Sequence, residues 1–259
     1  MSSNVVTEKK EHVLIIRLNR SDIMNSLERD LVADLKAALR NFDHDNETRA
    51  AILTGQGKAF CAGGSLSTMK DFKDVNDSMQ YMNECNEIIE LINGTNKPVI
   101  AAVNGAAVGA GFNMAIACDM VIASSNAFFA QSFLKVGLVP DMSGLFYLPR
   151  VVGVLRAKEL VYTGRSVKAD EALQMGVANI VVTPEALEHT AFDMACRLAR
   201  GPSVAFRLGK RILSTSLDGN LKDVIQQETY AQTICLQTED YKEGLLAFFE
   251  KRSPVFKGK

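Results

Sequence analysis

Two glycine-containing segments each follow a predicted strand, and their residue types suit a site that binds an anionic oxygen through the main chain. The first covers residues 57–66 and reads GKAFCAGGSL, and the second covers residues 104–112 and reads NGAAVGAGF. Small residues let a ligand approach the backbone, and a helix that begins there leaves its first N–H groups without intrahelical partners. Two such segments side by side would aim two N–H donors at one oxygen. A tight turn is the simpler interpretation of either segment alone.

One acidic residue, Asp141, follows a proline within an apolar stretch and is the candidate base. Its neighbours include Phe133, Leu138, Val139 and Leu145. A carboxylate lodged among apolar side chains has its pKa raised toward the value that a base needs at neutral pH. An aspartate after a proline also shapes turns or caps helices. The local sequence is compatible with both roles.

Other ligand classes are disfavoured by the sequence. Neither glycine segment has the Lys-Ser/Thr ending of a P-loop or the spacing of a dinucleotide-binding fingerprint. The three histidines are scattered without ligand spacing, so we expect no metal. The formal net charge is -1, which gives no basic field for a phosphate backbone, so we expect no nucleic-acid partner.

Alternating strands and helices are predicted to position the glycine segments and Asp141. Short runs of apolar and β-branched residues predict strands, and apolar residues at helical spacing predict helices. The strands are expected at 13–18, 50–54, 99–103 and 120–123, and the helices at 27–42, 78–92 and 109–118. This alternation implies an α/β fold with a largely parallel sheet covered by helices.

Helical patterns dominate after residue 150. Helices are expected at 154–163, 169–175, 184–200, 203–215, 221–236 and 238–249, with one strand at 179–182. Gly201 and Pro202 interrupt the pattern, so we predict a core domain of residues 1–200 and a helical C-terminal module of residues 201–259. A module this thin cannot form its own core and usually packs on its parent domain or on a neighbouring subunit.

The cysteines and the absence of long apolar runs predict a cytoplasmic protein, with an organelle matrix as the alternative. The five cysteines are odd in number and never have CxxC spacing, which favours reduced thiols. The first residues are charged where a signal peptide would be apolar, and no run reaches the roughly 20 apolar residues that span a bilayer. We therefore expect no membrane association.

Four stretches of the sequence together resemble the enoyl-CoA hydratase/isomerase (crotonase) superfamily. They are FCAGGSL at 60–66, KPVIAAVNGAAVGAGFNMAIACD at 97–119, FAQSFLKVGLVPDMSGLFYLPRVVG at 129–153, and the ending FFEKRSPVFKGK. The resemblance covers almost the whole chain in the right order. It implies a spiral of ββα units, a helical tail that builds a trimer or a dimer of trimers, and an acyl-CoA thioester substrate, with coenzyme A as part of the substrate and no separate cofactor.

The resemblance also assigns roles to individual residues. The thioester oxygen would accept hydrogen bonds from the amides of Gly64 and Ala110, which together form an oxyanion hole. The segment Ala62, Gly63, Gly64, Ser65 and Leu66 would line the CoA arm, although many members have an acid where this chain has Ser65. In the tail, Phe256 and Lys257 match residues that border the CoA adenine and phosphates across a subunit boundary.

The residues at the family's acid/base positions indicate which reaction to expect. Hydratases of the family use two glutamates, and the matching positions here are Asn113 and Phe133, which we place in the substrate pocket. Adding water to a double bond needs two acid/base groups, so the departure argues against a standard hydratase. Asp141 falls where isomerase-like members place a catalytic acid. We therefore predict isomerisation of an unsaturated acyl-CoA with Asp141 as acid/base.

Three alternatives to isomerisation remain open on the sequence. Asp141 also matches the nucleophile of a dehalogenase member, which would give thioester hydrolysis or halide displacement. Hydration is the second alternative. A catalytically silent CoA-thioester binder is the third, since the loss of both glutamates fits it as well.

Overall fold

A computed structural model describes residues 3–259, and its centre is built from strand-strand-helix units. In each unit the first strand joins a six-stranded sheet and the second joins a four-stranded sheet. The first unit consists of β3 (Ala50–Gly55), β4 (Ala59–Cys61) and α3 (Val75–Gly94). The second consists of β5 (Val99–Val103), β6 (Ala106–Val108) and α4 (Ala110–Ala117). The third consists of β7 (Met120–Ser124), β8 (Phe128–Ala130) and α5 (Gly144–Val152).

The six-stranded sheet has the order β1-β2-β3-β5-β7-β10 and is parallel except at β1. Its remaining strands are β1 (Val5–Lys10), β2 (Val13–Leu18) and β10 (Ile180–Val182). Every residue of β3 and β5 is buried, as expected for parallel strands covered on both faces. The main core lies on the side of α1 (Arg29–His44), α3 and α4, and a smaller one lies between the sheet and α8 (Leu187–Ala199). All five predicted strands are present.

The four-stranded sheet, with the order β4-β6-β8-β9, was not predicted. Its strands have three residues each, including β9 (Ser166–Lys168). Three residues are too few to show the alternation by which a strand is recognised in a sequence. This small sheet matters for function, because β4 and β6 lead into the two glycine segments.

Several helix boundaries differ from the predictions. The helix expected from residue 27 begins at Arg29, because Leu27 pairs with Gly64 in an isolated β-bridge. The helix expected from residue 184 begins with a 3-10 turn, η3 (Pro184–Ala186), before α8. The helices α6 (Val154–Thr163) and α7 (Ala169–Gln174) lie close to their predicted bounds, whereas α5, η1 (Ser21–Ile23), η2 (Phe133–Val136) and α2 (Leu66–Lys70) were not predicted.

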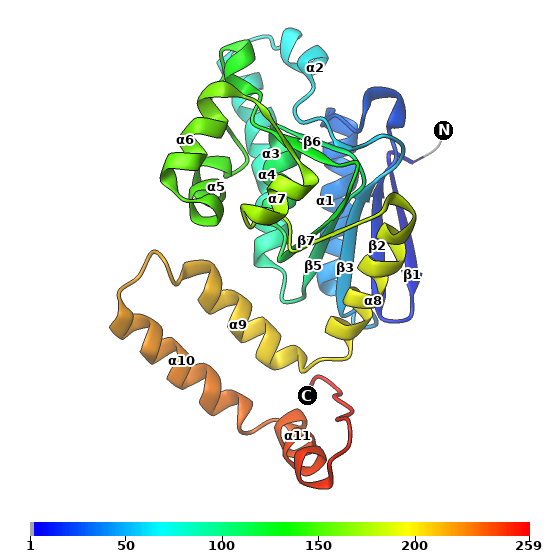
Figure 1. The fold of residues 1–259 in the computed structure, drawn as a ribbon, viewed down its shortest axis with the longest axis vertical. Coiled ribbons are helices and arrows are strands. Elements are labelled where there is room, and N and C mark those ends of the chain that lie inside the picture. The colour runs from blue at the N-terminus through cyan, green and yellow to red at the C-terminus, as the bar shows by residue number, and fades with distance from the viewer. Residues whose placement is uncertain (1–2) are drawn as a thin grey trace.

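The C-terminal helices extend away from the sheets (Figure 1). They are α9 (Ser203–Thr215), α10 (Leu221–Cys235) and α11 (Glu239–Glu250), and neither α9 nor α10 contains a buried residue. One anchor to the core is Lys210, whose ammonium group lies 2.8 Å from the carboxylate of Asp119 and also donates to the carbonyl of Ile92. The division at residue 200 stays a prediction.

All five cysteines are free thiols; four are buried and Cys235 is partly exposed. Between residues 3 and 259, no helix combines the length and the apolar character needed to cross a membrane.

Candidate functional site

The small sheet brings the two glycine segments together. Strands β4 and β6 pair in parallel, with Ala59 opposite Ala106, so the chain leaves both strands at the same end. The first segment continues into α2, and the second reaches the start of α4 at Ala110. The segments are therefore neighbours in space although about 45 residues separate them in sequence.

Gly63 allows the closest approach between the two segments. A Cβ atom at this position would lie 2.6 Å from the carbonyl oxygen of Val108 and 3.3 Å from the amide nitrogen of Ala110. The backbone of Gly63 also has φ +94°, which L side chains rarely adopt. Glycine is required here on both grounds, and its absence of a side chain places the first segment directly against the amide of Ala110.

The amide of Gly64 has a direction set by the peptide that contains it. The carbonyl of Gly63 accepts a hydrogen bond from the amide of Leu27 at 2.8 Å. Because the peptide is planar and trans, the N–H of Gly64 points away from Leu27. Within residues 3–259, this N–H has no hydrogen-bond acceptor.

The amide of Ala110 is directed by the start of a helix. The carbonyl of Gly109 accepts from the amide of Asn113 at 3.1 Å, as a helical carbonyl does, so the N–H of Ala110 in the same peptide points out of the N-terminus of α4. It too has no acceptor in the described part of the chain. The positive end of the helix dipole favours negative charge at this place.

Asp141 lies in the loop between η2 and α5 with its carboxylate turned into the protein. Its Oδ1 atom is buried and has no hydrogen-bond partner among residues 3–259. Burial raises the pKa of Asp141 to about 6, against a smaller lowering effect of a backbone hydrogen bond. The cap position of α5 belongs to Ser143, and no side chain caps that helix. The carboxylate is therefore not a helix cap, although the main-chain carbonyl of Asp141 does close a turn to Gly144.

The burial of Asp141 does not come from three of the neighbours that the sequence suggested. Leu138, Val139 and Leu145 are exposed, whereas Phe133 and Met142 are buried. The apolar character of the stretch thus predicted the direction of the pKa shift but not the residues that cause it.

Asn113 connects Asp141 to the helix that begins with Ala110. Its Nδ2 donates to the main-chain carbonyl of Asp141 at 2.8 Å, and its Oδ1 accepts from Nε2 of Gln131 at 2.6 Å. Asn113 is fully buried and packs so tightly on Gly144 that a Cβ there would lie 2.3 Å from it. The amide therefore holds the Asp141 loop about one helical turn from Ala110, the first residue of α4.

Replacing Asn113 with alanine is expected to destabilise the fold by about 1–3 kcal/mol, because the Gln131 amide and the Asp141 carbonyl would lose their partner. Urea denaturation measures the change. The matched control is Asn126→Ala on an exposed turn, for which a change below about 0.5 kcal/mol is expected. Equal stability of the two variants would contradict the role of Asn113 in holding the Asp141 loop.

Phe133 also lies against the second glycine segment. A Cβ at Gly109 would be 3.4 Å from the ring carbon Cζ of Phe133, and the ring itself is buried. Asn113 and Phe133 therefore both contact the second segment, and neither carries a carboxylate.

The remaining sequence-predicted residues fall into two groups. Ser65 is buried and accepts from the amide of Thr68 at 3.1 Å as the cap of α2, while Leu66 is exposed beside it. Phe256 and Lys257 lie at the other end of the sheet, where their carbonyls accept from Arg49, the residue before β3. One chain alone therefore does not bring the tail to the glycine segments, which follow β3.

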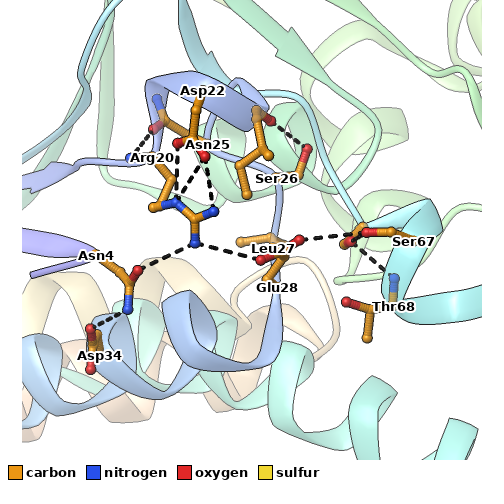
Figure 2. Close-up of polar contacts among 12 residues, drawn as sticks. Asn4, Arg20, Asp22, Asn25, Ser26, Leu27, Glu28, Asp34, Ser67 and Thr68 are labelled. Atoms are coloured by element: carbon orange, nitrogen blue, oxygen red, sulfur yellow. Dashed lines mark hydrogen bonds and ion pairs between the residues drawn. The ribbon is translucent and has the colours of Figure 1, made fainter. Parts of the chain in front are cut away.

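A loop that sequence reasoning overlooked supports the first glycine segment. Figure 2 shows this loop, residues 20–28, beside the start of α2. Asn25 is fully buried; its Oδ1 accepts from the amide of Arg20 at 2.8 Å and its Nδ2 donates to the carbonyl of Ala59 at 2.9 Å. The Arg20 side chain contacts Asn4 and Glu28. An arginine and an asparagine in a short loop gave no signal of this role, because their partners are distant in sequence.

The family model described as enoyl-CoA hydratase/isomerase matches residues 8–259. The chain belongs to the enoyl-CoA hydratase/isomerase family. A solved structure of an enoyl-CoA hydratase from Bacillus anthracis superimposes with a TM-score of 0.95 at 36% identity, covering 99% of this chain and 100% of that chain. The predicted crotonase-like fold with a helical C-terminal segment is confirmed.

Curated members of the family differ in the reaction that their names give. The chain is 36% identical to the short-chain-enoyl-CoA hydratase of Clostridium acetobutylicum, over 96% of each chain. It is 34% identical to the 1,2-epoxyphenylacetyl-CoA isomerase of Escherichia coli, over the full length of both. Family membership thus makes this protein an enzyme of the hydratase/isomerase type, and the residues of its own site must indicate which reaction it performs.

Proposed function

We propose that this protein shifts the double bond of an unsaturated acyl-CoA, with Asp141 as the only acid/base group. The observation that carries the proposal is the buried, unpartnered Oδ1 of Asp141, a residue whose main-chain carbonyl Asn113 holds beside the helix that begins with the free amide of Ala110. The Oδ1 atom lacks a competing hydrogen bond and the carboxylate has a pKa of about 6, so at neutral pH it is ionised and still basic enough to take a proton.

The proposed reaction moves one proton between two carbons. The carboxylate of Asp141 takes a proton from C2 of a 3-enoyl-CoA, and the electron pair of that C–H bond delocalises into the thioester and the adjacent double bond. The resulting dienolate oxygen would accept hydrogen bonds from the amides of Gly64 and Ala110, each worth roughly 3 kcal/mol in comparable sites. The protonated Asp141 then gives the proton to C4. The product is the conjugated 2-enoyl-CoA, and no cofactor is consumed.

Hydration is disfavoured by the environment of the two family glutamate positions. Asn113 is committed to Asp141 and Gln131, and Phe133 covers Gly109 with a ring. Neither side chain can take a proton from water, so hydration would require Asp141 alone both to take a proton from water and to return one to the neighbouring carbon.

The test is incubation of the protein with a 3-enoyl-CoA while the ultraviolet absorbance of the conjugated product is followed. Formation of 2-enoyl-CoA without a 3-hydroxyacyl-CoA product supports the proposal. Rapid hydration of a 2-enoyl-CoA with no double-bond shift would contradict it. A covalent adduct on Asp141, found by mass spectrometry, would favour the nucleophilic alternative, and binding without turnover would favour the silent binder.

The pH dependence of this reaction follows from the pKa of Asp141. The base must be ionised, so kcat/KM is expected to rise about tenfold per pH unit below pH 6 and to level off above it. An aspartate with its ordinary pKa of 3.8 would put this rise about two pH units lower. Initial rates between pH 4.5 and about 8 measure the profile. A flat profile through pH 6 would rule out Asp141 as the base.

The proposal includes self-association through the C-terminal helices as a trimer or a dimer of trimers. Large apolar side chains on these helices, such as Leu213, Leu221 and Phe248, are more than two thirds exposed in the single chain. Exposed apolar groups of this size are usually covered by another surface.

A further inference from the structure

The hydroxyl of a buried tyrosine connects Ser65, the residue after Gly64, to Leu27 in the neighbouring loop. Tyr81, on α3, is fully buried, and its hydroxyl donates to the carbonyl of Leu27 at 2.5 Å. The same oxygen accepts from the amide of Ser65 at 3.3 Å. A Cβ at Gly64 would lie 3.8 Å from this oxygen. The phenol therefore lies directly beside the peptide that carries the proposed oxyanion donor.

The contacts of Tyr81 complete a ring of hydrogen bonds around Gly64. On one side, the amide of Leu27 donates to the carbonyl of Gly63, and the carbonyl of Leu27 accepts from Tyr81. On the other side, Ser65 donates to Tyr81. The peptide before Gly64 and the peptide after it are thus both tied, directly or through Leu27, to one hydroxyl group.

The peptide between Gly63 and Gly64 needs such an external restraint. Glycine has the widest range of backbone conformations, and here it stands on both sides of the peptide. No local side chain can therefore fix the direction of the Gly64 N–H. An oxyanion donor is effective only when its direction is set before charge develops, so the restraint must come from elsewhere in the fold.

The position of the Tyr81 ring is itself well defined. The ring lies 5.4 Å from that of Phe72, centroid to centroid, and the guanidinium of Arg29 lies 5.5 Å from its centroid. Arg29 is in turn paired with Asp77, one turn before Tyr81 on α3. A ring held on these sides presents its hydroxyl to Leu27 and Ser65 in one place.

We propose that Tyr81 is a positioning residue for the oxyanion hole, acting through Leu27 and Ser65 on the direction of the Gly64 amide. This inference rests on the proposed function, because it assumes that the Gly64 amide stabilises a thioester enolate. The ring of Tyr81 supplies packing, whereas its hydroxyl supplies the hydrogen bonds to Leu27 and Ser65. The hydroxyl and the ring can be separated experimentally.

The test compares Tyr81→Phe with the parent by kinetics. Phenylalanine keeps the ring packing and removes the oxygen, so kcat for the double-bond shift is expected to fall about 10- to 100-fold, as for a misaligned donor, with KM changed less than about twofold. The matched control is Tyr147→Phe, which removes a phenol from α5, where no hydrogen bond of that phenol is present within residues 3–259. It is expected to leave kcat within about twofold of the parent.

A spectroscopic measurement separates this inference from the proposed function. A conjugated arylenoyl-CoA absorbs at longer wavelength when its carbonyl is polarised, and the parent and Asp141→Asn are both expected to produce this red shift on binding. Tyr81→Phe is expected to lose most of it. If the parent produces no shift, the proposed oxyanion hole is wrong. If the parent shifts the spectrum and Tyr81→Phe does so equally with unchanged kcat, the role of Tyr81 is wrong.

A second pair of variants tests the same role should Tyr81→Phe fold poorly. Ser65→Pro removes the amide that donates to Tyr81, and φ of -75° at Ser65 already suits proline. Ser65→Ala keeps that amide and removes only the cap of α2. The proline variant is expected to lose more of the red shift than the alanine variant, and equal spectra would contradict the inference.

Discussion

Replacing Asp141 with asparagine is expected to lower kcat for the double-bond shift by about 10²- to 10⁴-fold, the usual contribution of a positioned general base. The amide is nearly isosteric but cannot take a proton from C2. Binding of the acyl-CoA should be little changed, because the residues that we propose to contact CoA lie elsewhere and the proposed oxyanion donors are main-chain groups. The measurement is steady-state kinetics with a 3-enoyl-CoA, and Asp170→Asn, on the exposed face of α7, is the control.

The same substitution should change stability in the opposite direction to activity. The folded-state pKa of Asp141 is raised from 3.8 to about 6, so the folded protein favours the neutral acid. Stability from this group is complete below pH 3.8 and is lost as the pH rises through 6. At pH 7.5 the asparagine variant should therefore be more stable than the parent, by roughly 1–3 kcal/mol. A variant that is inactive and also less stable at this pH would indicate a structural role for the carboxylate.

Replacing Ala110 with proline is expected to lower kcat/KM by about 10²- to 10³-fold, as found when one oxyanion donor is removed. Proline deletes the N–H of Ala110 and places ring atoms where that hydrogen was. The helix itself should tolerate the change, because Ala110 is the first residue of α4 and proline is favoured there, and because Gly109 before it has no Cβ to clash.

The control for this prediction is Ala110→Gly, which keeps the amide and removes only the methyl group. Circular dichroism and thermal unfolding should show both variants folded. If the proline variant keeps activity within about tenfold of the glycine variant, the amide of Ala110 is not an oxyanion donor.

The large sheet and most helices could be predicted because their apolar residues extend far enough along the sequence to show the period of a strand or a helix. The strand at 99–103 and the helices at 154–163 and 203–215 have the predicted bounds. The three-residue strands of the small sheet show no pattern of their own. They form because neighbouring strands, such as β6 and β8, offer partners that only the folded chain brings close.

The candidate site was predictable where it depends on residue type and not where it depends on distant contacts. The two glycine segments and Asp141 were selected from their residue types, Gly64 and Ala110 were assigned within those segments by the family resemblance, and the roles of all three residues remain predictions. Tyr81 looks in the sequence like one more apolar position of a helix. Its hydroxyl meets Leu27, which lies 54 residues away, and no local pattern encodes that contact.

The two proposed oxyanion donors belong to the backbone, and this divides the protein into parts that change independently. No substitution at Gly64 or Ala110 other than proline can remove an N–H, whereas residues 113, 133 and 141, which belong to the proposed site, contribute side chains that single codon changes exchange. The proposed oxyanion hole should thus be retained as the sequence diverges, while the side chains that transfer protons are replaced around it. Engineering of new thioester chemistry on this scaffold should begin at those three side chains.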